Sequence, residues 1–208
     1  VKWMVYKSIF STFVQNINLG QMTESERKQI IALIQREVIP AIGCTEPIAV
    51  ALCVAKATET LGAKPEKIKV LLSANILKNA MGVGIPGTGM IGLPIAVALG
   101  ALIGKSDYQL EVLKDSTPEA VEEGKKLIDE KRICISLKED ITEKLYIEVT
   151  CEAGGEQATA IISGGHTTFV YVAKGDEVLL NKQQTSGEEE EEETLELTLR
   201  KVYDFALT

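Results

Sequence analysis

The chain has 208 residues, with 22 Lys and Arg residues against 30 Asp and Glu residues, and a formal net charge of −8. Apolar residues make up 45% of the chain and charged residues 25%, which is typical of globular proteins and excludes intrinsic disorder as the overall state. The acidic balance, the lack of a Lys/Arg cluster and the 5% of aromatic residues argue against nucleic acid as a partner.

Hydropathy and cysteine usage indicate the expected compartment. The longest apolar run, from Ile91 to Ile103, has 13 residues, fewer than the roughly 18–20 that cross a bilayer, so no membrane partner is expected. Residues 1–21 lack the features of a signal peptide. The cysteines form no C-x-x-C pair, which favours free thiols in a reducing, cytoplasmic compartment. They are Cys44, Cys53, Cys134 and Cys151.

The first elements follow an N-terminal stretch of different character. Residues 1–21 hold the only Trp and show no clear hydrophobic period, so we interpret them as an extension of uncertain origin before a domain at 22–208. Thr23 followed by Glu26 predicts a capping box, and Pro40 is expected to end the helix that this box opens.

A second helix is predicted over Thr45–Leu61, with Gly62 as its stop. The stretch Pro47–Ala55 is entirely apolar, which predicts a helix that is buried on most sides, with Cys53 as a small core residue. A strand, a short helix or turn, a glycine-rich loop and two further helices are predicted after it. They span 67–72, 73–80, 82–92, 93–103 and 117–130.

From Arg132 onward the pattern predicts strands. Gly154-Gly155 and Gly175-Asp176 supply turns, which favours an antiparallel β-meander with Cys134 and Cys151 facing the core. The strands are expected at 132–137, 145–151, 157–162, 168–173 and 177–180.

Two features are predicted near the C-terminal end of the sequence. The run of Glu at 188–193 is interpreted as a solvated loop or helix start, and a last helix is expected at 195–206. We therefore predict an α+β fold, with helices around a glycine-rich loop packed with a mostly antiparallel sheet.

Three segments contain residues that could take part in catalysis or substrate binding. The first is Gly43-Cys44-Thr45-Glu46-Pro47. Thr45 is expected to be the N-cap, and Pro47 suits the first turn. Because a helix start favours negative charge, Cys44 is expected to hold a larger thiolate fraction than a free cysteine. A thiolate can be a base, a nucleophile or a metal ligand; the alternative is an ordinary helix start.

The second segment has five glycines between residues 82 and 92. Such a loop before a helix exposes N–H groups that suit a carboxylate or phosphate. Its G-x-G-x-x-G pattern is not interpreted as a dinucleotide fingerprint, because a helical segment separates it from the strand and Pro86 interrupts it. The alternative is a tight turn that allows close helix packing. The candidate substrate-binding residues are Asn75, Lys78, Asn79, Gly87, Thr88 and Gly89.

The third segment carries the only histidine, His166, directly after Gly164-Gly165. We expect His166 on a turn with access to a cleft, where its near-neutral titration would make it a proton carrier. The alternative is a structural histidine. Cys44 and His166 are therefore the candidate catalytic residues, and no metal ligand is assigned.

Together these segments resemble the L-cysteine desulfidase family, which is related to the iron–sulfur L-serine dehydratases. The resemblance runs from Met22 to the C-terminus and rests on PAIGCTEPIAVAL, ANILKNAMGVGIPGTGMIGLPIAVALGAL followed by LEVLKD, and IISGGHTTFVYV, in this order. It implies a lyase that splits L-cysteine into sulfide, ammonia and pyruvate without pyridoxal phosphate. It also implies a [4Fe-4S] cluster held by three cysteines, with Cys44 at the position of the proposed base.

Family proteins are about twice as long, and their cluster cysteines lie in the C-terminal half. We therefore expect this chain to be the N-terminal half of such an enzyme, inactive alone and without a complete cluster. The alternatives are a small amino-acid or carboxylate-binding module and one subunit of a split two-chain enzyme. The expected partners are a small amino-acid substrate, the missing C-terminal half or a partner subunit, and a second copy of the chain in a homo-oligomer.

Overall fold

The computed structural model describes residues 22–182 and 197–207. These residues belong to two compact units, a body of residues 40–182 and a terminal unit in which 22–39 join 197–207. The hydrophobic pattern of 22–208 does not reveal this division. The interpretations of the extension at 1–21 and of the Glu run at 188–193 fall outside the described residues.

The terminal unit consists of helix α2 (Glu24–Glu37) and helix α7 (Leu199–Ala206). The predicted capping box is present, because the Glu26 N–H donates to Thr23 Oγ1 at 3.2 Å and the Thr23 N–H donates to Glu26 Oε2 at 3.0 Å. Helix α7 begins later than its predicted start at 195, because Thr198 is its N-cap.

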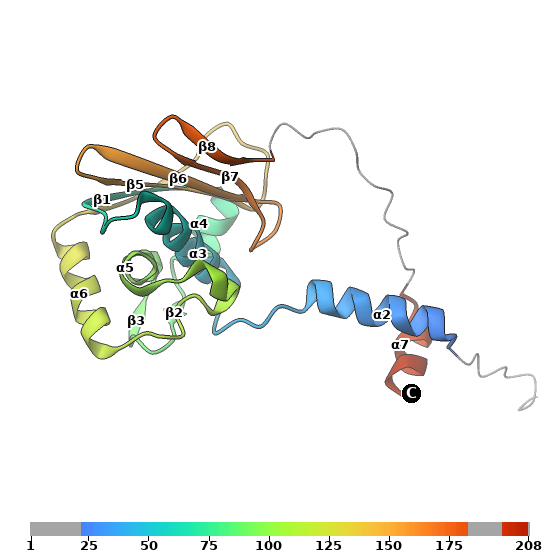
Figure 1. Ribbon diagram of the computed structural model, residues 1–208. Helices are drawn as coiled ribbons and strands as arrows, with labels where there is room; N and C mark the ends of the chain where they lie inside the picture. Colours follow the sequence, from blue (N-terminus) through green and yellow to red (C-terminus); the bar gives the residue numbers. More distant parts are fainter. Residues whose placement is uncertain (1–21, 183–196, 208) are drawn as a thin grey trace, which may run out of the picture. The chain divides into compact units, whose positions relative to one another are not determined.

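The body is a six-stranded sheet with helices packed on one of its faces (Figure 1). This arrangement confirms the predicted α+β class with a mostly antiparallel sheet. The strand order is β4-β1-β5-β6-β7-β8. The helices are α3 (Thr45–Leu61), α4 (Ala74–Ala80), α5 (Leu93–Ile103), the 3₁₀ helix η1 (Ser106–Glu111) and α6 (Pro118–Asp129). The sheet strands are β1 (Lys67–Leu72), β4 (Ile133–Leu137), β5 (Tyr146–Ala153), β6 (Glu156–Ser163), β7 (Phe169–Lys174) and β8 (Glu177–Asn181).

One strand pairing differs from the predicted meander. Strands β5 to β8 pair antiparallel in chain order, as predicted. Strand β4 instead pairs parallel with β1, and β1 lies between β4 and β5. The prediction of one meander from Arg132 onward is therefore wrong at its first strand. The physical reason is that the helices between β1 and β4 return the chain to the end of the sheet where β1 began, as a parallel crossover requires.

The same pairing corrects the placement of Cys134. Cys134 lies opposite Lys69 in the register and is exposed. Its neighbours Ile133 and Ile135 pack against the core, so strand alternation turns the Cys134 side chain to the face without helices. The prediction that Cys134 faces the core is wrong.

Helix α3 lies at the centre of the body, in contact with β5 and β6 on one side and α5 on another. Pro47–Ala55 are all buried, which confirms the prediction for this helix. Cys53 and Cys151 are core residues as predicted: the Cys53 thiol donates to the Ala160 carbonyl at 3.3 Å, and Cys151 Sγ lies 3.6 Å from the Thr58 hydroxyl.

Candidate functional site

Cys44 stands at the N-terminus of α3 with an exposed, free thiol. Cys44 is itself the N-cap, and its side chain makes no capping hydrogen bond. The prediction of Thr45 as the N-cap is wrong by one residue, because Thr45 is already helical and its hydroxyl donates to the Glu46 carboxylate at 3.3 Å. The Cys44 carbonyl accepts the N–H of Ile48 as the first turn of the helix. A thiol therefore occupies the positive end of a 17-residue buried helix.

The glycine-rich segment folds as a small hairpin of β2 (Gly84–Ile85) and β3 (Met90–Ile91), a feature that the predicted loop did not include. Gly87 and Gly89 take positive φ values of 76° and 65° at its tip, a conformation that glycine adopts without strain. The Thr88 hydroxyl donates to the Ile85 carbonyl at 2.7 Å and accepts the Met90 N–H at 3.0 Å. This hydroxyl therefore holds the turn together; contact with a substrate stays a prediction.

The hairpin contacts the segment that carries Cys44. A Cβ atom at Gly43 would lie 2.9 Å from Pro86 Cγ, so the absence of a side chain at Gly43 allows this close approach. On the other side, the Ile42 N–H donates to the Leu110 carbonyl of η1 at 3.3 Å. The structure thus brings together the first and second candidate segments around the residue that precedes Cys44.

Helix α4 presents Asn75, Lys78 and Asn79 as exposed side chains. Asn75 lines a cleft of about 530 Å³ between the start of α4 and residues 137–144. The lining of this cleft contains neither Cys44 nor His166. The three polar residues of α4 therefore share one short helix, and Asn75 among them borders a cleft.

His166 lies on the turn between β6 and β7, as predicted, and it is half-buried, whereas its access to a cleft stays a prediction. The Gly164 N–H donates to the Leu145 carbonyl at 3.2 Å, which fixes this turn against the start of β5. Helix α4 is fixed to the same place, because the Ser73 hydroxyl donates to the Lys144 carbonyl at 2.8 Å and the Ser73 N–H to the Tyr146 carbonyl at 3.0 Å. Consecutive residues at the start of β5 thus hold both the His166 turn and α4 in place.

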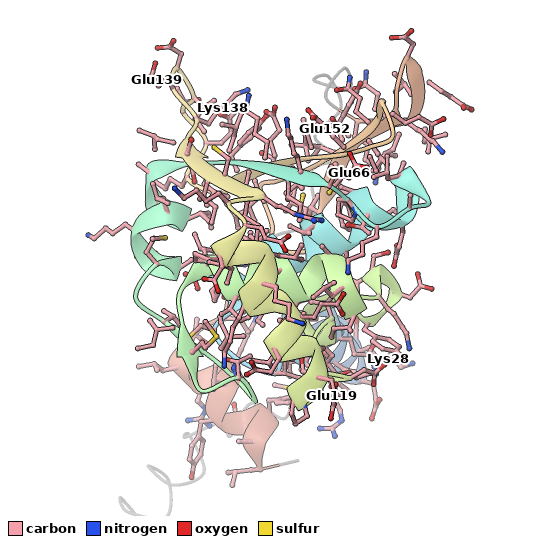
Figure 2. The ribbon with its side chains drawn as sticks, turned by 90° about the vertical axis from the view of Figure 1, so that its left-hand side faces the viewer. Lys28, Glu66, Glu119, Lys138, Glu139 and Glu152 are labelled. Atoms are coloured by element: carbon pink, nitrogen blue, oxygen red, sulfur yellow. The ribbon has the colours of Figure 1, made fainter. Side chains whose placement is uncertain are left out.

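The N-terminus of α3 points to this same end of the sheet. Its C-terminus is tied to the opposite end, where Lys174 Nζ donates to the Leu61 carbonyl at 3.0 Å. The thiol of Cys53, in the middle of α3, lies 3.8 Å from the carbonyl of Ile147 at the start of β5, so the half of the helix before Cys53 lies toward the end of the sheet that carries the His166 turn. Figure 2 shows these ends, with Lys138 and Glu139 on the side of α4 and Glu66 and Glu152 on the other.

The remaining cysteines do not gather around Cys44. Burial raises the pKa of the Cys53 thiol well above its ordinary value and that of Cys151 to about 11, so both are kept neutral in the core. Cys134 is exposed on the edge strand β4. Across 22–182 and 197–207, no group of three or more His, Cys, Asp or Glu side chains is placed to hold a metal ion.

A polar cluster near the cleft was not predicted from the sequence. Glu148 Oε2 accepts hydrogen bonds from Lys138 Nζ at 2.8 Å and from the Tyr146 hydroxyl at 2.7 Å. Burial, and then the hydrogen bond to Glu148, raise the pKa of Tyr146 above its ordinary value. Tyr146 and Glu148 are two apart on a predicted strand, which places them on one face, but Lys138 comes from another strand end that no local pattern relates to them.

Comparison with known proteins shows close relatives of greater length. The chain is 81% identical over 187 residues to a UPF0597 protein of Bacteroides thetaiotaomicron, which covers 90% of this chain and 44% of that protein. It is 75% identical over 187 residues to one of Phocaeicola vulgatus, with 90% and 43% covered, and 47% identical over 192 residues to one of Porphyromonas gingivalis, with 89% and 44% covered. The chain thus spans less than half the length of these relatives, whose name states no activity.

No family profile matches the chain. No solved structure matches it significantly. Within the part of the chain that the structure describes, no helix has the length and apolar character needed to span a membrane.

Proposed function

We propose that this chain forms one wall of the active site of a lyase that resembles L-cysteine desulfidase and the iron–sulfur L-serine dehydratases. The observation that carries the proposal is the position of Cys44, a free exposed thiol at the start of the buried helix α3, with the glycine-rich hairpin packed against Gly43. The substrate is a small L-amino acid with a thiol or hydroxyl group on Cβ.

In the proposed α,β-elimination, Cys44 is the base. Its thiolate takes the proton from Cα of the substrate, the electron pair of that C–H bond forms the Cα–Cβ double bond, and the β-substituent leaves. The aminoacrylate tautomerises to an imine, which one water molecule hydrolyses to pyruvate and ammonia. The position supports this role because the thiol is exposed at the positive end of the α3 dipole.

The other candidate residues bind the substrate and handle the second proton. His166 is proposed to protonate the leaving sulfide or hydroxide. Polar groups of α4 and backbone N–H groups at the hairpin tip are proposed to hold the substrate carboxylate, because charged and amide donors form strong hydrogen bonds to carboxylates. Thr88 contributes by shaping that tip. The carboxylate-binding groups are Asn75, Lys78, Asn79, Gly87 and Gly89.

The iron–sulfur cluster that the resemblance implies does not fit the cysteines described here. Cys53 and Cys151 are buried as neutral thiols within the core, and Cys134 lies on an edge strand. A cluster in the complete protein would need ligands from outside the described residues. Cys44 and His166 are assigned the two proton transfers alone.

The chain by itself is proposed to bind a small amino acid without converting it. It spans 44% of the Bacteroides thetaiotaomicron relative, and its core cysteines cannot serve as ligands without unfolding. Isothermal titration with L-serine is expected to show binding to the isolated chain, and Lys78→Gln is expected to weaken it about tenfold through loss of one charged hydrogen bond. Equal affinities of the two proteins would remove Lys78 from the site.

Turnover is tested in a chimera in which this chain replaces the matched part of the Bacteroides thetaiotaomicron relative. After anaerobic reconstitution with iron and sulfide, the chimera is expected to bind about four irons, as one [4Fe-4S] cluster requires, and to release pyruvate from L-cysteine or L-serine. Cys44→Ser is expected to lower kcat at least about 100-fold with substrate binding retained.

Cys134→Ser is the matched control, because it changes the other exposed thiol at a place away from α3. It is expected to keep the iron content and the pyruvate rate of the chimera. A Cys44→Ser rate within a factor of two of the parent would show that Cys44 is not the base. Absence of pyruvate from a chimera that carries a full cluster would reject the lyase function itself.

A further inference from the structure

Helix α7 and its C-cap residue carry an apolar stripe, defined by four exposed residues at helical spacing. The exposed fractions are 92% for Leu199, 51% for Val202, 58% for Tyr203 and 68% for Leu207. None of the residues of α7 is buried. Because isolated helices this short are marginal in water, α7 needs a packing partner for its apolar side.

The contact between α7 and α2 uses other residues. Lys201 Nζ lies 3.5 Å from Glu26 Oε1, and the Arg27 guanidinium lies 5.3 Å from the centre of the Phe205 ring. Lys201 and Phe205 are four residues apart and so lie on one face of α7. Pairing with α2 therefore leaves the stripe uncovered.

Helix α2 does not supply a core for the unit either. Ile30 is its one buried apolar residue among those described, at 4% exposure. Ile34, Val38 and Ile39 remain open to solvent at its C-terminal end. The described part of the terminal unit thus has one buried apolar side chain, Ile30, while Ile31, Leu33 and Phe205 are partly covered.

We propose that the apolar stripe of α7 is the docking face for a helix from the portion of the homologous protein that this chain does not contain. More than half of each compared relative lies outside the matched stretch, so a covalently linked partner of sufficient size exists in those proteins. The charges beside the stripe neutralise each other, because Arg200 Nε lies 2.9 Å from the Asp204 carboxylate. The complementary surface is accordingly an apolar helix face without net charge.

The test compares the isolated chain with the chimera described above, by hydrogen exchange of the peptide that spans 197–207. In the isolated chain, its amides are expected to exchange rapidly. In the chimera, exchange is expected to slow at least tenfold, and Val202→Asp combined with Tyr203→Asp is expected to restore the rapid rate. Val178→Asp combined with Leu179→Asp, an equally exposed apolar pair on β8, is the matched control and is expected to keep the protection.

The outcomes are distinct from those of the lyase test, since neither iron nor turnover is read. Equal exchange of α7 in the chain and in the chimera would overturn the proposal. Protection that survives in the Val202 and Tyr203 variant would also overturn it. Light scattering tests whether a second copy of the chain binds the stripe instead. If the isolated chain is a dimer and the variant with Val202→Asp and Tyr203→Asp is a monomer, the stripe is a dimer interface and the proposal is rejected.

Discussion

The body and the terminal unit each contain a helix with apolar residues at helical spacing, but the two helices differ strongly in how many residues they bury. Eleven of the 17 residues of α3 are buried, whereas α7 has no buried residue. Both helices have apolar residues at helical spacing, and α7 also has a side-chain N-cap, which α3 lacks. Local signals therefore define where a helix forms, but they do not tell whether its apolar face has found a partner.

The comparison is sharpest for one substitution made in both units. Leu52→Ala removes a fully buried side chain at the centre of α3, and Leu199→Ala removes one that is 92% exposed. We expect Leu52→Ala to lower the free energy of unfolding by about 3 kcal/mol, since it leaves a cavity in a packed core. Leu199→Ala is expected to change it by less than about 0.5 kcal/mol. Urea unfolding of the isolated chain measures both, and similar losses would contradict the division into a packed and an unpacked unit.

Alkaline pH should destabilise the body through its buried thiols. Burial raises the pKa of Cys151 to about 11 from an ordinary value of 9.0. A raised pKa in the folded state gives stability that is complete below pH 9 and is lost as the pH rises toward 11. The expected loss is about 1.4 kcal/mol per pH unit for this group.

Cys151→Ala removes that titration and is expected to reduce the slope between pH 9 and 11 by the share of Cys151, while the share of the buried Cys53 thiol, whose pKa is also raised, remains. The cost of the lost packing is the same at every pH. Cys134→Ala, at an exposed position, is the control and should keep the slope of the parent chain. Urea midpoints at closely spaced pH values provide the measurement. A parallel decline for the parent and for Cys151→Ala would show that Cys151 is not the titrating group.

Much of the fold follows from local sequence patterns, because most helices and strands show a hydrophobic periodicity and are followed by a residue or turn that ends them. Helix α3 has an apolar stretch and Gly62, and strands β5 to β8 have turns between them. The order of the strands does not follow from such signals. The central place of β1 depends on pairing between residues that are far apart in sequence, such as Val70 with Ile135 and with Val149. Adjacency in the chain favoured a meander, and the helical crossover overrode it.

The candidate site shows the same limit. Residue chemistry identified Cys44 and His166 as candidates, and the structure places their elements toward one end of the sheet. Which polar groups are already engaged could not be read from the chain. The Thr88 hydroxyl and the partners of Glu148 are fixed by hydrogen bonds that depend on turn geometry and strand register.

The contact between Gly43 and Pro86 joins the two candidate segments. Adding one methyl group at Gly43 by substitution with alanine tests whether this contact matters. In Gly43→Ala the new Cβ would meet the Pro86 ring at 2.9 Å, so either the hairpin or the Cys44 segment must move. The expected cost is about 1–2 kcal/mol, as for other overpacked contacts. Gly82→Ala is the control, because a Cβ there meets no atom within 4 Å.

The second readout is the rate at which iodoacetamide alkylates Cys44 in the folded chain. A displaced segment is expected to change this rate in Gly43→Ala while Cys134, on a distant strand, reacts as before. Lower stability with an unchanged Cys44 rate would mean that the hairpin supports the fold without positioning the thiol. An unchanged rate and unchanged stability would show that the contact constrains neither segment, and the glycine-rich hairpin would then have no part in shaping the Cys44 site.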